Sequence, residues 1–280
     1  MYLFNKLKKK FQKRFNLYDF VGRQGIRSNS DNGEYVASVK NALGSYAAFA
    51  KFKRDPRYQA ILEHTSKAQG EACLKIIRAQ SPGFIDEIDK FKINDLVGGA
   101  TTFEFEIIGR ISPSTLRYLK VASDLQTLFG DQIGNEIAEI GCGYGGQLLI
   151  LDNAFHFMHC DLFDLPPVLS LTSMYLESHL LNSSYKAITL NQHPGNVMYD
   201  LVISNYAFSE LPSPLQIAYI DKVISKAKRG YLTMNTGKTE SSRDENKLTI
   251  EDLRNRLPAF EILPESPLTS PNNYIIVWGR

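Results

Sequence analysis

The sequence predicts an α/β protein in which a mostly parallel sheet is covered by helices on both faces. Short apolar runs alternate with helical stretches from about residue 137 to the end of the chain. The first of these runs leads directly into a glycine-rich turn, and a helical stretch follows the turn. This alternation is typical of a doubly wound sheet, whose ligands bind at the carboxyl ends of the strands.

The second half of the chain supplies the elements of this sheet. Expected strands are 137–140, a stretch within 155–163, 186–190, 201–204, 230–234, 260–263 and 274–278. Expected helices are 147–154, 167–181, 215–227 and one near 250–257. The result is a seven-stranded, mostly parallel sheet with helices packed on it.

The first half of the chain is helical in pattern. Apolar residues recur at helical spacing between residues 36 and 90, and 94–112 is expected to be a connecting segment or short strand. Ser112 and Pro113 supply a cap and a first-turn proline for the next helix. We therefore divide the chain into a helical region, 1–115, and a sheet domain, 116–280. The helical region is expected to act as a lid, to bind substrate or to form a homodimer.

Composition excludes several classes of protein. The net charge of +2 lacks the strongly basic character of a nucleic-acid-binding domain. Three cysteines, Cys73, Cys142 and Cys160, form no CxxC pair, which favours a reducing compartment over a disulfide framework. Without a secretory signal or a membrane-spanning run, the expected location is the cytoplasm.

A basic, partly aromatic segment begins the chain. Six lysines and arginines fall within residues 6–14, and Phe4, Leu7, Phe11 and Phe15 recur among them at helical spacing. Such a helix could lie on an anionic membrane surface, which would place the protein peripherally at the inner membrane through residues 1–17. The alternative is that the stripe packs on the protein's own helices and the lysines are solvated.

The turn after the first strand carries the strongest chemical signal. It reads Glu139-Ile140-Gly141-Cys142-Gly143-Tyr144-Gly145-Gly146, and glycines allow a sharp turn and the close approach of a ligand. The spacing differs from the GxGxxG of dinucleotide sites, and an acid precedes the first glycine. A carboxylate there suits a cationic ligand, so we expect S-adenosylmethionine to bind at Glu139, Gly141, Gly143, Tyr144 and Gly145. The alternative is a purely structural turn.

Acidic residues after the second strand are candidates for binding ribose hydroxyls. Asp164, which precedes Leu-Pro and a helix, is the first choice, and Asp161 is the alternative. Either could instead cap a turn or helix. After the third strand, 191–193 lies where an adenine amino group could be met.

The fourth strand ends in Ser204-Asn205-Tyr206-Ala207-Phe208-Ser209-Glu210. Ser204 is a further expected cofactor contact, and Asn205 and Tyr206 are expected beside the donor methyl group. Methyl transfer to a hydroxyl needs alignment and a base to accept the proton, for which Glu210 is the best candidate. Its alternative role is a cap or an ion pair. No Asn-Pro-Pro-Tyr tetrapeptide follows the strand, which counts against methylation of nucleic-acid bases.

Other reactive side chains form no convincing site. His156 and His159 do not by themselves make a metal site, and Cys142 has no neighbouring histidine in the sequence to activate it. We therefore expect no metal.

Several of these motifs resemble one known family. The stretches Ile111 to Tyr118, Leu128 to Gly130, Glu139 to Gln147, Asp164 to Pro166 and Asn205 to Glu210 are similar to those of sugar O-methyltransferases from bacterial surface-polysaccharide clusters. The similarity runs from about residue 50 to the end. It implies a Rossmann-like class I methyltransferase fold, a sugar or glycan acceptor, and substrate binding by Arg117 and Tyr118. One departure is that Tyr206-Ala207 replaces a His-Ser pair of the family, which gives Glu210 more weight as the base.

The leading expectation is therefore S-adenosylmethionine-dependent methyl transfer to a sugar hydroxyl in surface-glycan biosynthesis. One alternative is a methyltransferase for another small or lipid-linked acceptor. A second is a catalytically silent assembly partner with the same fold. A dehydrogenase is disfavoured by Glu139 and by the spacing of the glycines.

Overall fold

The computed structural model describes residues 33–235 and 247–280. The basic segment 1–17 lies outside these residues, as do residues 236–246. Within the described ranges, no helix is both long and apolar enough to cross a membrane.

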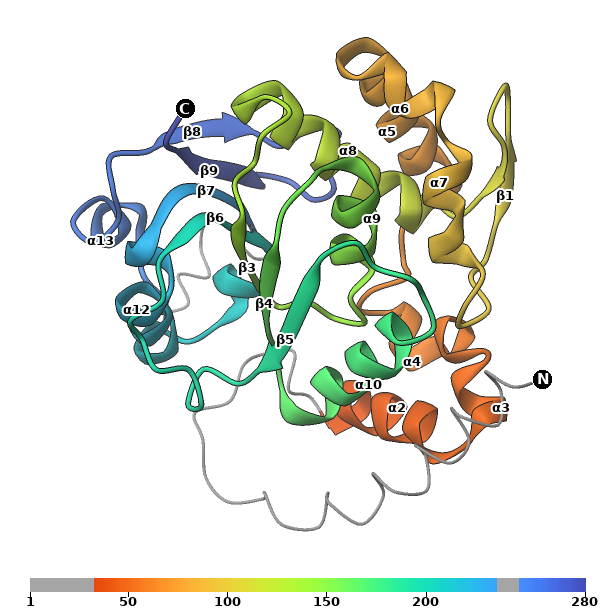
Figure 1. Ribbon diagram of the computed structural model, residues 1–280, viewed down its shortest axis with the longest axis horizontal. Helices are drawn as coiled ribbons and strands as arrows, with labels where there is room; N and C mark the ends of the chain where they lie inside the picture. Colours follow the sequence, from red (N-terminus) through yellow and green to blue (C-terminus); the bar gives the residue numbers. More distant parts are fainter. Residues whose placement is uncertain (1–32, 236–246) are drawn as a thin grey trace.

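A seven-stranded sheet forms the centre of the molecule (Figure 1). Its strands are β3 (Glu136–Ile140), β4 (His159–Phe163), β5 (Ser184–Ile188), β6 (Tyr199–Asn205), β7 (Ala227–Met234), β8 (Glu261–Pro264) and β9 (Tyr274–Trp278). Their order is β5-β4-β3-β6-β7-β9-β8, and only β9 runs antiparallel to its neighbours. The expected seven-stranded, mostly parallel sheet is confirmed.

Helices cover both faces of this sheet (Figure 1). One face packs against α8 (Pro113–Phe129), α9 (Gly146–Ala154) and α10 (Pro166–Leu176). The other packs against α12 (Ser213–Lys222), η4 (Ile224–Lys226) and α13 (Ile250–Arg254), with the short α11 (Ala207–Glu210) following β6. The helix expected over 215–227 thus ends earlier, because the apolar run after it enters a 3-10 turn and then β7.

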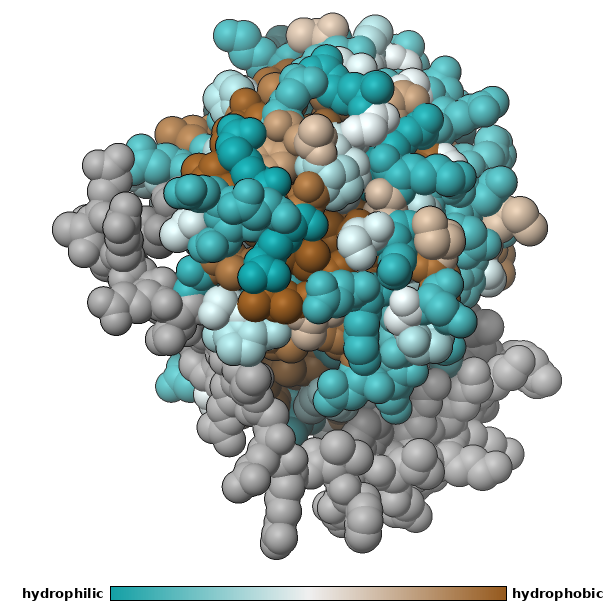
Figure 2. Space-filling model, turned by 90° about the vertical axis from the view of Figure 1, so that its left-hand side faces the viewer, coloured by the Kyte–Doolittle hydropathy of each residue, from teal (hydrophilic) through white to brown (hydrophobic). Residues whose placement is uncertain are grey.

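Side chains alternate between two cores along each strand, as the pleat of a strand requires. Ile137 belongs to the core under α8 and α9, whereas Ala138 belongs to the core under α12 and α13. The side on which α12 and α13 lie is mostly hydrophilic, with apolar residues gathered in a hollow near its centre (Figure 2).

The helical N-terminal region continues the first of these cores. It contains α2 (Gly33–Gly44), α3 (Tyr46–Phe49), η2 (Phe52–Arg54), α4 (Pro56–Gln59), α5 (Lys67–Gln80), α6 (Pro82–Asp86), α7 (Asp89–Lys92), η3 (Ile93–Asp95) and a hairpin of β1 (Phe103–Phe105) with β2 (Gly109–Ile111). Helix α5 packs along α8, and α2 packs along α10. Ser112 caps α8 by accepting a hydrogen bond from the Thr115 N–H, as expected.

An aromatic cluster joins the N-terminal region to the sheet domain. The Phe52 ring lies 5.6 Å from the Tyr144 ring of the glycine turn, and Tyr144 lies 4.8 Å from Tyr175 of α10, both measured between ring centroids. Lys53 is buried among these rings, and its Nζ donates a 2.6 Å hydrogen bond to the Asn94 carbonyl. Aromatic packing therefore seats the N-terminal helices directly against the glycine turn.

Candidate functional site

The glycine turn between β3 and α9 requires glycine for its backbone conformation. Gly141, Gly143 and Gly145 have φ angles of 78°, 54° and 89°, in the left-handed region that favours glycine. A Cβ on Gly141 would lie 2.0 Å from the Ala207 Cβ, so the segment after β6 packs directly on the turn. The Gly141 N–H also donates a 2.8 Å hydrogen bond to the Phe163 carbonyl at the end of β4.

Glu139 is a buried carboxylate with an unused oxygen beside this turn. Its side chain is 3% exposed, and among the described residues its Oε2 has no hydrogen-bond partner. Burial, together with the nearby Asp164 carboxylate, raises the pKa of Glu139 well above its usual range. A buried acid of this kind is stabilised in its ionised form by a cation, which the described part of the chain does not supply.

Asp164 closes the turn from the end of β4. Its Oδ2 accepts a 2.9 Å hydrogen bond from the Gly143 N–H, and its Oδ1 accepts a 2.7 Å bond from the Leu165 N–H. Burial raises the pKa of Asp164 to about 6, although these two bonds oppose the shift. Because a carboxylate oxygen has two lone pairs, each oxygen retains room for one further donor such as a hydroxyl.

Asp161, the alternative to Asp164, lies on the opposite face of the sheet from Glu139. It pairs in register with Ala138, whose side chain belongs to the core under α12, whereas Glu139 is one residue further along β3. The Asp161 carboxylate accepts a 2.6 Å hydrogen bond from the Tyr199 hydroxyl and contacts His159 at 3.2 Å. The geometry therefore favours Asp164 as the acid beside the turn and gives Asp161 a structural role.

Residues 191–193 were expected near the adenine of the cofactor. Among them, the His193 side chain already contacts other groups of the protein. His193 is buried, its Nδ1 accepts a 3.1 Å hydrogen bond from the Gly195 N–H, and its Nε2 lies 2.9 Å from the Tyr199 hydroxyl. These contacts hold His193 within the loop after β5.

Two expected cofactor contacts have other roles. The Ser204 hydroxyl donates to the Ile140 carbonyl at 2.9 Å and accepts from the Phe208 N–H at 3.0 Å, so it fastens the turn to β6. The Tyr144 side chain is buried in the aromatic cluster, where its hydroxyl accepts a hydrogen bond from Asn94. Only the backbone of Tyr144 belongs to the turn.

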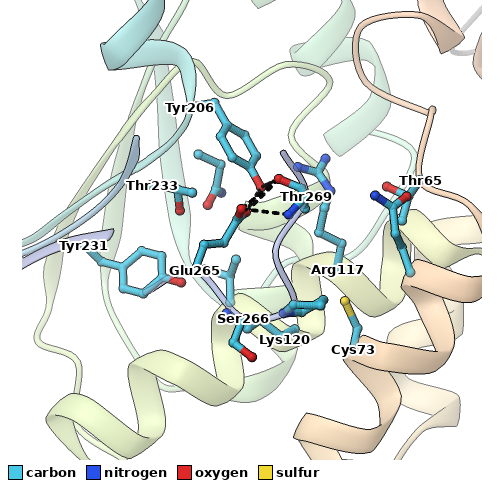
Figure 3. A pocket seen from close by; sticks show the side chains of 14 residues that line it. Thr65, Cys73, Arg117, Lys120, Tyr206, Tyr231, Thr233, Glu265, Ser266 and Thr269 are labelled. Carbon is cyan, nitrogen blue, oxygen red and sulfur yellow. Dashed lines mark hydrogen bonds between the residues drawn. The ribbon is translucent and has the colours of Figure 1, made fainter. Parts of the chain in front are cut away.

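A pocket opens beside the turn, at the carboxyl ends of β6 and β7 (Figure 3). It is lined by Thr65, Gln69, Cys73, Arg117, Lys120, Val121, Asn205, Tyr206, Tyr231, Thr233, Glu265, Ser266, Pro267 and Thr269. We call it the edge pocket. It brings together three residues that the sequence singled out: Arg117, Asn205 and Tyr206.

The edge pocket and the glycine turn are joined by Asn205, the last residue of β6, and the two residues after it. Asn205 and Tyr206 line the pocket, and the next residue, Ala207, packs on Gly141. The Asn205 side chain also donates a 3.3 Å hydrogen bond to Gln147 in the first turn of α9. A ligand over the turn and a ligand in the pocket would therefore lie next to each other.

Tyr206 is held in the pocket by two features. Its backbone has a φ of 69°, which is uncommon for a residue with a bulky side chain, and residues in such conformations cluster at functional sites. Its hydroxyl donates a hydrogen bond to Glu265 and lies 3.0 Å from the Thr269 hydroxyl (Figure 3). Burial raises the pKa of Tyr206, and the Glu265 carboxylate adds to this shift.

Glu265 was not anticipated from the sequence, and it is the acid that lines the pocket. Its Oε2 accepts a 2.9 Å hydrogen bond from the Thr269 N–H. Strand β8 is antiparallel to β9, and β9 is antiparallel to β7, so β8 ends at the same edge as the parallel strands. Its position two residues after the strand expected at 260–263 was the available signal. Glu210, the expected base, lies in α11 and is not among the lining residues.

The two substrate-binding residues implied by the family resemblance, Arg117 and Tyr118, lie in different places. Arg117 lines the edge pocket, with its guanidinium 5.0 Å from the Tyr118 ring centroid and 6.0 Å from that of Tyr206. Tyr118 itself is buried against Tyr144 and does not line the pocket.

The N-terminal region covers the turn from outside. A Cβ on Gly143 would lie 2.9 Å from Cδ1 of Leu62, which shows that this side chain rests on the turn. Burial and the nearby Asp164 carboxylate raise the pKa of Tyr35 in α2, so α2 lies close to the acid. Entry of a ligand over Gly143 therefore requires Leu62 to move.

The sheet order, the glycine turn after its first parallel strand and the acid at the end of the next define a Rossmann-like class I methyltransferase fold. No family model matches the chain, and no curated protein matches its sequence.

Solved structures with a similar arrangement include three methyltransferases. Magnesium protoporphyrin IX methyltransferase from Synechocystis PCC 6803, with bound SAH, has 16% identity and a TM-score of 0.43 over 75% of this chain and 98% of that one. An rRNA methylase from Streptococcus thermophilus has 16% identity and a TM-score of 0.41 over 57% and 95%. An O-methyltransferase family protein from Burkholderia thailandensis has 12% identity and a TM-score of 0.40 over 58% and 59%.

Proposed function

We propose that this protein is an S-adenosylmethionine-dependent methyltransferase that methylates a hydroxyl of a sugar in surface-glycan biosynthesis. The observation that carries the proposal is the unpartnered, buried Oε2 of Glu139 beside the glycine turn. Among the described residues, this oxygen has no hydrogen-bond donor and no cation beside it. The ammonium of the cofactor's methionine part would supply both. Asp164, at the other side of the turn, would accept hydrogen bonds from the ribose hydroxyls.

When bound, S-adenosylmethionine supplies an electrophilic methyl group on a sulfonium. The residues of this chain must then position the acceptor oxygen and accept its proton. Tyr206 and Glu265 are arranged for the second task, because the Tyr206 hydroxyl already donates to Glu265. Tyr206 Oη would take the proton of the acceptor hydroxyl while passing its own proton to Glu265. We therefore propose Glu265, acting through Tyr206, in place of Glu210 as the base.

The sugar as acceptor is supported by the sequence resemblance and by the lining of the edge pocket. Hydrogen-bonding side chains such as Gln69, Asn205 and Thr233 lie there beside the rings of Tyr206 and Tyr231. Hydroxyl groups of a sugar need such partners, and its C–H faces pack on aromatic rings.

Calorimetric titration with S-adenosylhomocysteine, which retains the ammonium, tests the cofactor assignment. We expect the wild-type protein to bind it and Glu139→Gln to bind about 10- to 100-fold more weakly, because the charge of the acceptor is lost. Glu136→Gln is the matched control at the start of the same strand and should bind normally. Absence of wild-type binding would overturn the proposal. Transfer of a labelled methyl group to a panel of sugars then tests the acceptor.

A further inference from the structure

Arg117 is a cation without a matching anion in the edge pocket. Its Nε is buried and has no hydrogen-bond partner among the described residues. The other cation of the pocket, Lys120, differs because its Nζ forms a 2.6 Å ion pair with Asp124. Within residues 33–235 and 247–280, no carboxylate lies within 4.0 Å of the Arg117 guanidinium.

Two acids in the neighbourhood of Arg117, Glu265 and Glu63, form no ion pair with it. Glu265 accepts hydrogen bonds from Tyr206 and from the backbone and hydroxyl of Thr269. Glu63, in the segment before α5, attracts Arg117 electrostatically but forms no ion pair with it, and its buried Oε1 has no hydrogen-bond partner among the described residues. Neither acid therefore neutralises the guanidinium directly.

The rings beside Arg117 leave its hydrogen-bonding edge available. Tyr118 and Tyr206 contact the guanidinium through their rings, at 5.0 and 6.0 Å from the centroids. Ring contacts of this kind stabilise the cation but use none of its N–H groups as partners for an anion. A planar guanidinium supplies parallel N–H donors that match the two oxygens of a carboxylate or phosphate.

We infer that Arg117 binds an anionic group of the acceptor, so that the substrate is an acidic sugar unit carrying a carboxylate or phosphate. This inference rests on the proposed function, because it assigns the edge pocket to the acceptor. Arg117 and Tyr206 line the same pocket, so the anionic group and the methylated hydroxyl belong to one sugar unit or to two adjacent ones.

Matched pairs of sugars test the inference by saturation-transfer NMR on protein saturated with S-adenosylhomocysteine. Glucuronate is compared with glucose, and galacturonate with galactose; glucose 1-phosphate distinguishes a phosphate from a carboxylate. We expect an acidic sugar to bind about 10- to 100-fold more tightly than its neutral partner, as charge-assisted hydrogen bonds would give. Arg117→Gln should remove this preference, and Arg117→Lys should retain part of it.

Arg110→Gln is the matched control, since it removes one positive charge from an exposed residue of β2 outside the pocket. It should keep the preference, and all three variants should bind S-adenosylhomocysteine as the wild type does. Equal binding of acidic and neutral sugars, absence of binding by both, or a preference unchanged in Arg117→Gln would overturn the inference. Failure of the wild type to bind S-adenosylhomocysteine would instead contradict the proposed function. The sugar pairs can then be compared in the absence of S-adenosylhomocysteine.

Discussion

The backbone N–H of Gly143 donates a 2.9 Å hydrogen bond to Oδ2 of Asp164, which links the glycine turn after β3 to the acid after β4. The contact connects two adjacent parallel strands at their carboxyl ends. It also places the Asp164 carboxylate close enough to Glu139 to raise the pKa of that side chain. A buried acid, Glu139, and a partly buried one, Asp164, therefore lie on either side of the turn.

Asp164→Ala should weaken the binding of S-adenosylhomocysteine by about 1.5–3 kcal/mol, because the ribose hydroxyls would lose a charged acceptor. Asp161→Ala is the comparison, since Asp161 bonds to Tyr199 and points to the other face of the sheet. It should reduce stability while leaving the dissociation constant unchanged. Calorimetry on both folded variants decides between the two acids, and a reversed pattern would mean that Asp161 contacts the ribose.

The stability of the ligand-free protein should depend on the ionisation of Asp164. Its pKa rises from an ordinary 3.8 to about 6 in the folded state, so folding favours the protonated acid. The contribution of protonated Asp164 to the free energy of unfolding is fully present below pH 4 and is lost as the pH rises to about 6. This is a change of about 3 kcal/mol. Urea unfolding should therefore show wild type losing stability relative to Asp164→Asn across this range.

Asp200 supplies a control of opposite sign for this titration. A hydrogen bond from Lys228 lowers the pKa of Asp200 to about 2, aided by the Asn135 N–H. Wild type should therefore gain stability relative to Asp200→Asn as the pH rises from about 2 to 4. A flat difference between wild type and Asp164→Asn from pH 4 to 6 would contradict the environment described for Asp164.

Gly143→Val should abolish the binding of S-adenosylhomocysteine for two reasons. The φ of 54° disfavours a β-branched side chain, and any Cβ meets Leu62 and fills the surface over the turn. Gly130→Ala is the control, because Gly130 also has a positive φ, of 77°, but follows α8 and has no neighbour within 4 Å of an added Cβ. Calorimetry should show normal binding by that variant, and normal binding by Gly143→Val would refute the proposed cofactor site.

Glu265→Gln and Tyr206→Phe should each slow methyl transfer by about 10²–10⁴-fold, the range for removal of general acid–base catalysis. Neither should change the affinity for S-adenosylhomocysteine, because both side chains lie in the edge pocket rather than at the turn. Glu210→Gln is the comparison. Single-turnover rates with a labelled methyl group measure the effect, and a loss confined to Glu210→Gln would restore the base first expected from the sequence.

The basic segment 1–17 yields a separate prediction about membranes. Each lysine or arginine close to an anionic surface contributes about 1 kcal/mol, and six of them lie in residues 6–14. If the segment binds membranes, co-sedimentation with anionic liposomes should fall when residues 1–17 are deleted and when salt is raised. If the full-length protein stays in the supernatant at low salt, this role is excluded. The result would instead favour packing of the apolar residues Phe4, Leu7, Phe11 and Phe15 within the protein.

The sequence by itself determined the parts of the fold that depend on local patterns. Strand and helix periodicity, the acid before Gly141 and the cap at Ser112 identified the sheet, the turn and the start of α8. These features are readable because they depend on neighbours within a few residues: a left-handed turn needs glycine, and a helix start needs an oxygen acceptor.

Only the tertiary structure decided which side chains meet at the site. Glu265 reaches Tyr206 because β8 is joined to the sheet through the antiparallel β9, a pairing between segments that no local pattern specifies. Likewise, Tyr144 lies within the turn and Ser204 near the end of β6, yet their side chains are engaged by Asn94 and by the Ile140 carbonyl, respectively. The physical reason is that a side chain's role depends on the partners brought to it by strand order and register, and these are set by long-range packing.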